Sequence, residues 1–82
     1  MTTTAPSPKA APSGPGGTRD QLVRALQANW RREMDGARTY RELAAKEPDQ
    51  SRADVLRRLA EAEQRHAERC ATRLHELGAP VP

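Results

Sequence analysis

The sequence predicts an all-α fold, an antiparallel two-helix hairpin that is either part of an oligomer or a piece of a larger protein. Apolar residues recur along two segments at alternating steps of three and four, which is the helical period. A short Pro-containing break joins the segments, and short connections make neighbouring helices antiparallel. The chain of 82 residues has no Phe, one Trp and one Tyr. One hairpin therefore has little apolar surface to bury, and small domains of this kind normally need a partner.

Residues 1–17 are rich in Thr, Ala, Pro, Ser and Gly, with Lys9 as the one charged side chain. Such a composition cannot offset the entropy cost of ordering, so we expect a disordered tail. At Thr18 the pattern changes, because its hydroxyl stands three residues ahead of Gln21, the spacing of a capping box. We expect the first helix to begin at Thr18.

One charged residue interrupts the apolar stripe of the first helix. The stripe consists of Leu22, Leu26, Trp30, Ala37, Tyr40 and Ala44, widened by Val23, Met34 and Leu43. The steps between its later members alternate four and three, as in the seam of an antiparallel helical pair. Position 33 belongs to the same series, and it is Glu33.

A break at Pro48 separates the two helices. Helical geometry is disfavoured for the residue before a proline, and Asp49 or Ser51 can cap the helix that follows. We expect the second helix to begin near Ser51, with Asp54 completing another capping box, and to end at Gly78. The hairpin would then occupy residues 18–78, ahead of a C-terminal tail of residues 79–82.

The expected seam of the second helix also contains polar residues. It reads Leu56, Leu59, Glu63, His66, Cys70, Leu74 and Leu77. Residues three apart on a helix lie one turn apart along the axis and about 60° apart around it, so Glu63 and His66 project side by side. With the turn centred near residues 48–50, Glu33 is level with a position between Glu63 and His66.

We call Glu33, Glu63 and His66 the polar layer. A carboxylate in an apolar seam costs several kcal/mol unless it is paired or bound. Carboxylate oxygen with some imidazole nitrogen suits iron or manganese. Helical bundles build dinuclear sites from a Glu on each of two helices and Glu-x-x-His on each of two others. The hairpin holds half of that set, and two hairpins about a twofold axis would hold all of it.

The polar layer also fits arrangements without iron or manganese. It could be a buried Glu–His ion pair, or the hairpin could be rotated so that both glutamates reach water beside Arg32 or Arg65. Cys70 follows His66 by four residues, which allows a zinc site of His, Cys and Glu, although a lone Cys in a seam is more often an apolar filler. We expect Trp30 to be a packing anchor and Glu61, Glu68 and His75 to face solvent.

Two motifs carry a family resemblance. Tyr40 follows Glu33 by one heptad and opens the run Tyr-Arg-Glu-Leu-Ala, and residues 59–66 read Leu-Ala-Glu-Ala-Glu-Gln-Arg-His. In these motifs the segment from about Leu22 to Leu77 resembles the rubrerythrin-like branch of the ferritin-like superfamily. It looks most like the ferritin-like domain at the N-terminus of some vacuolar iron transporter family proteins. Its plan is similar to that of encapsulated ferritins, two-helix chains that form a ferroxidase centre only between subunits.

The resemblance implies half of a ferritin-like four-helix bundle, completed by oligomerisation. It also implies that Glu33, Glu63 and His66 are metal ligands and catalytic residues of a di-iron centre that oxidises Fe(II), for iron storage or detoxification. Glu63 would be able to bridge two irons. Zinc and manganese are the other metals that suit these side chains. A complete rubrerythrin domain has a second helix pair, so we expect either a self-associating half-bundle or a fragment of a longer protein.

The alternative to metal chemistry is a helical-hairpin interaction module whose polar layer sets the register of partner helices. We do not expect a nucleic-acid partner, because the net charge of +3 comes from arginines that interleave with acidic residues and no recognition motif is present. No apolar run approaches the roughly 20 residues that span a bilayer. With one Cys and no signal-peptide pattern, we expect a cytoplasmic protein, or one held inside a protein compartment.

Overall fold

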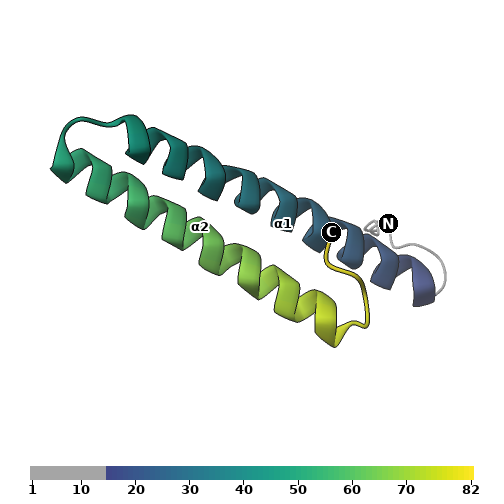
Figure 1. Ribbon diagram of the computed structural model, residues 1–82. Helices are drawn as coiled ribbons and strands as arrows, with labels where there is room; N and C mark the ends of the chain where they lie inside the picture. Colours follow the sequence, from purple (N-terminus) through teal and green to yellow (C-terminus); the bar gives the residue numbers. More distant parts are fainter. Residues whose placement is uncertain (1–14) are drawn as a thin grey trace, which may run out of the picture.

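The structure, a computed structural model, describes residues 15–82 as two antiparallel helices, α1 (Pro15–Lys46) and α2 (Gln50–Glu76). Figure 1 shows the two helices side by side, joined by a tight turn, with the C-terminal segment returning toward α1. The described residues contain no strand, so the predicted all-α hairpin is confirmed. Neither helix has an apolar stretch that could traverse a bilayer. Of the predicted tail, residues 1–14 lie outside the described residues.

Helix α1 begins three residues earlier than predicted, at Pro15 instead of Thr18. Proline is favoured at the first helical position because the N–H that it lacks would have no intrahelical partner there, and its φ already suits a helix. Residues 15–17 therefore extend α1, although their composition resembles that of the predicted tail. Thr18 lies inside the first turns of the helix.

Asp49 caps α2. Its backbone is extended, with φ −84° and ψ 120°, and its carboxylate accepts a hydrogen bond from the backbone N–H of Arg52 at 2.9 Å. The second helix thus begins one residue before the predicted Ser51. The predicted capping box with Asp54 is wrong, because this carboxylate pairs instead with Arg57 one turn later.

The C-terminal end of α2 agrees with the sequence. Gly78 has a φ of 69°, in the left-handed region that glycine adopts without strain. Its N–H donates to the carbonyl of His75 at 2.9 Å, and the N–H of Ala79 donates to that of Leu74 at 2.9 Å. This pair of bonds is a Schellman motif, which satisfies carbonyls at the helix end.

The contact between the two helices is made mainly of alanine. One buried residue recurs every seven positions along much of each helix, and the set is Val23, Ala37, Ala44, Ala53, Ala60, Ala67 and Leu74. Ala44 and Ala53 are equidistant from the turn, and so are Ala37 and Ala60. Small side chains at such a contact let two helix axes approach closely. We call these residues the alanine row.

The predicted leucine seam of α2 is therefore displaced. Leu74 is buried, but Leu59 is 41% exposed, and Leu56 is only half-buried. Each helix can be numbered in repeats of seven positions, a to g, with the alanine row at position a. The leucines then occupy positions d and g on both helices. In an antiparallel pair, d and g of both helices lie on the same side of the contact. This open face carries Leu22, Leu26, Leu43, Leu56, Leu59 and Leu77.

We expect larger side chains in the alanine row to destabilise the hairpin. Ala60 is 1% exposed, so Ala60→Leu should lower the free energy of unfolding by about 1–3 kcal/mol because the helices must separate. Ala28→Leu, at an exposed position of α1, should change it by less than about 0.5 kcal/mol. Urea unfolding at one fixed protein concentration measures both. Equal losses in the two variants would contradict close packing at the row.

The turn also holds an acid-sensitive carboxylate. Glu47 Oε2 accepts a hydrogen bond from the backbone N–H of Asp49 at 3.0 Å and lies 3.3 Å from Nε of Arg52. The bond from Asp49, and then Arg52, lower the pKa of Glu47 below its ordinary value of 4.5. A carboxyl with a lowered folded pKa stabilises the fold above its unfolded pKa, and the effect is lost as pH falls through the folded value.

Glu47→Gln should therefore make the melting temperature depend less on pH under acidic conditions. The melting temperature of the wild type should fall on acidification below pH 4.5, and that of Glu47→Gln should fall less over the same range. Circular dichroism melts across this range compare the two proteins, with both kept at one concentration. Parallel profiles would show that the turn carboxylate does not contribute.

Candidate metal centre

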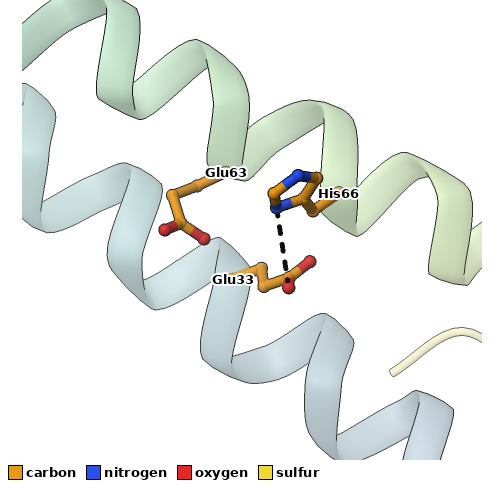
Figure 2. A group of neighbouring side chains, drawn as sticks. All are labelled: Glu33, Glu63 and His66. Carbon is orange, nitrogen blue, oxygen red and sulfur yellow. Dashed lines mark ion pairs between the residues drawn. The ribbon is translucent and has the colours of Figure 1, made fainter.

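The three residues of the polar layer converge between the helices. Figure 2 shows Glu33 on α1 turned toward Glu63 and His66, which lie one turn apart on α2. One ligand atom from each residue lies within 4.8 Å of the others. The structure thus brings together the three residues that the sequence singled out. Their role as metal ligands stays a prediction.

The heptad register explains this convergence. Glu33 and Glu63 occupy d positions that are almost equidistant from the turn, and His66 occupies the next g position of α2. All three lie on the open face, beside the alanine row instead of within the contact. Glu33 and Glu63 are consequently half-buried, while His66 is exposed. In this single chain the layer is bounded by leucines along the helices but is open to one side.

One oxygen of the layer has no partner. Oε1 of Glu33 is buried and accepts no hydrogen bond from the described residues. Its other oxygen, Oε2, lies 3.8 Å from Nδ1 of His66, which is beyond hydrogen-bond distance. A buried acceptor left unpaired costs about 1–3 kcal/mol. The layer is therefore not a satisfied Glu–His pair, and this oxygen is available to a cation.

Arginines do not neutralise the two glutamates. Within residues 15–82, the ion pairs of arginine go to other carboxylates. Arg32 donates a hydrogen bond to Asn29, and Arg65 lines a different hollow, among other residues of α2. The side chain of Glu33 is only 23% exposed. Within residues 15–82, neither Arg32 nor Arg65 forms an ion pair with these glutamates, although Arg32 lines the hollow beside them.

A hollow of about 450 Å³ opens beside the two glutamates. It is lined by Arg32, Glu33, Gly36, Thr39, Tyr40 and Glu63. Tyr40 is half-buried at this edge of the layer. Gly36 was not among the residues expected at the site. A glycine inside a long helix is nevertheless a usable signal, since it costs about 1 kcal/mol relative to alanine.

Cys70 does not join the converging group, which consists of Glu33, Glu63 and His66 within the described residues. Burial raises the pKa of the Cys70 thiol above its ordinary value, and the negative charge of Glu33 raises it further. The thiol is therefore protonated at neutral pH in the metal-free chain. Glu61, Glu68 and His75 are exposed, as expected, and Trp30 is half-buried.

A comparison with protein families gives one match. The family model described as Rubrerythrin matches residues 24–80, which is more than half of the 82-residue chain. The matched segment contains the whole polar layer and most of both helices. No curated protein and no solved structure gave a significant match.

The unpaired oxygen predicts a stability cost that metal-free protein should reveal. Glu33→Leu removes the buried acceptor and should raise the free energy of unfolding in the presence of a chelator by about 1 kcal/mol. Glu42→Leu is the matched control, because Glu42 is an exposed glutamate of the same helix. Urea unfolding at one concentration compares them. A Glu33→Leu variant less stable than the wild type would show that the carboxylate is satisfied.

Proposed function

Since the chain belongs to the rubrerythrin family, whose members typically bind iron, we propose that it forms a di-iron centre between two hairpins and oxidises Fe(II) there. Glu33, Glu63 and His66 are the proposed ligands. The observation that supports this is their convergence within 4.8 Å around a buried oxygen that has no hydrogen-bond partner.

The donor set fits iron. Two carboxylates and one imidazole offer oxygen and nitrogen, which hard and borderline metals prefer, and no thiolate that would favour softer ions. Carboxylate oxygens also stabilise Fe(III) relative to Fe(II), because their negative charge favours the more highly charged ion. The fit extends to the space around the layer, since the hollow beside Glu33 and Glu63 leaves room for a small oxidant.

A second copy of the chain would complete the site. Dinuclear carboxylate centres in helical bundles use a Glu from each of two helices and Glu-x-x-His from each of two others. One hairpin supplies one of each. Its open face carries leucines on both sides of the polar layer, and Leu22, Leu43 and Leu59 are 39–48% exposed. Packing this face against its own copy about a twofold axis would bury those leucines and bring two polar layers together.

In the paired hairpins each residue has a distinct task. Bound iron supplies the electrons that reduce dioxygen or peroxide. Glu33 would hold a metal ion through its buried Oε1, and Glu63 would hold one through its carboxylate on the facing helix. His66 would bind through a ring nitrogen that carries no proton. The leucines beside the layer exclude water from it, which strengthens the electrostatic interactions inside.

The test is iron content together with the rate of ferrous oxidation. The wild type should bind about one iron per chain, or two per pair of hairpins, and should oxidise Fe(II) faster than buffer. Glu63→Ala should lose both properties. Glu61→Ala is the matched control, because Glu61 is an exposed glutamate on the same helix, and it should keep both. Light scattering should report a mass above that of one chain.

Absence of iron above background in the wild type would overturn the proposal. The chain would then be better described as a helical-hairpin interaction module whose polar layer sets register. That description predicts that a chelator leaves both the mass and the melting temperature unchanged. A metal centre predicts the opposite, since a ligand that binds only the folded state raises its stability.

A further inference from the structure

Gly36 stands in the middle of α1, where a glycine is unfavourable. Among the described residues, Gly78 is the glycine with a positive φ, so no turn or left-handed backbone requires glycine at position 36. Helix propensity alone favours alanine there by about 1 kcal/mol. A glycine retained at this cost calls for a reason in the packing around it.

The side chain that lies over position 36 is that of Glu63, from the other helix. A Cβ placed on Gly36 would meet Cδ of Glu63 at 3.4 Å, Cγ at 3.5 Å and Oε1 at 3.6 Å, and these are its three nearest neighbours. The carboxylate of α2 therefore lies over bare backbone of α1. The distances are ordinary van der Waals contacts, so an alanine would fit without a clash. It would, however, remove the free space on that side of the carboxylate.

We propose that Gly36 is a positioning residue that keeps open a slot for the carboxylate of Glu63. Because no side chain fills the slot, the Glu63 carboxylate would have room to adjust its orientation toward a bound metal ion. The hollow that Gly36 lines together with Tyr40 and Thr39 gives the turning group its space. This inference rests on the proposed function, since it assigns Gly36 to the same metal centre.

The experiment uses the full chain, stripped of metal, and Co(II) as a spectroscopic probe. Gly36→Ala should raise the melting temperature of the metal-free protein by about 4–8 °C, because alanine favours the helix. The same variant should bind Co(II) at least about fivefold more weakly, and the visible spectrum of the bound ion should change. Gly36→Leu, which fills the slot with a good helix former, should lose more than about tenfold in affinity.

Gly17→Ala is the matched control. It makes the same substitution in the same helix, outside the polar layer, and should leave the affinity and spectrum of Co(II) unchanged. A double-mutant cycle then tests the specific partner. In a Glu63→Asp background the shorter carboxylate no longer reaches the slot, so adding Gly36→Ala should change Co(II) affinity by less than about twofold.

The outcomes separate the two proposals. A wild type that binds no Co(II) would overturn the metal centre and the slot together. A wild type that binds Co(II), with Gly36→Ala equal to it in affinity and spectrum, would overturn only the slot. If Gly36→Ala changes the mass of the assembly, Gly36 acts in packing between subunits, and the slot is again overturned.

Discussion

Close packing along the alanine row is the constraint on which the rest of this structure depends. Because Ala37, Ala44, Ala53 and Ala60 are small and buried, the two helices meet along backbone and methyl groups instead of interlocked leucines. Hydrophobic burial within one hairpin is correspondingly modest. The larger apolar side chains lie beside the contact, on the open face where we propose that a second copy packs.

The same packing decides where the polar layer lies. Glu33 and Glu63 are next to the row, so they are half-buried and turned toward each other, and His66 lies one position further out. Had the leucines formed the contact, both carboxylates would have been enclosed between two helices with no route for a metal or an oxidant. Their displacement puts a potential metal site at a surface that another hairpin can cover.

Two features of the layer lower the stability of the hairpin. The buried Oε1 of Glu33 accepts no hydrogen bond from residues 15–82, and Gly36 weakens α1 beneath the carboxylate of Glu63. Local rules of stability are most often broken at functional sites. An unpaired oxygen and an unfilled space next to the same two carboxylates are consistent with a site that is satisfied only when a cation is bound.

The sequence by itself determined the two helices, the turn and the identity of the polar layer, because helical period, Pro48 and Gly78 act locally. The position of the turn fixes which residues of the two helices lie at the same height. The sequence could therefore place Glu33 opposite Glu63 and His66. Only the tertiary structure decided which stripe is buried. The apolar stripe on each helix is wide enough for either alanine or leucine to face the partner helix, and interhelical distance, which no local pattern encodes, selects between them. It also showed which side chain lies over position 36, since Glu63 comes from the other helix.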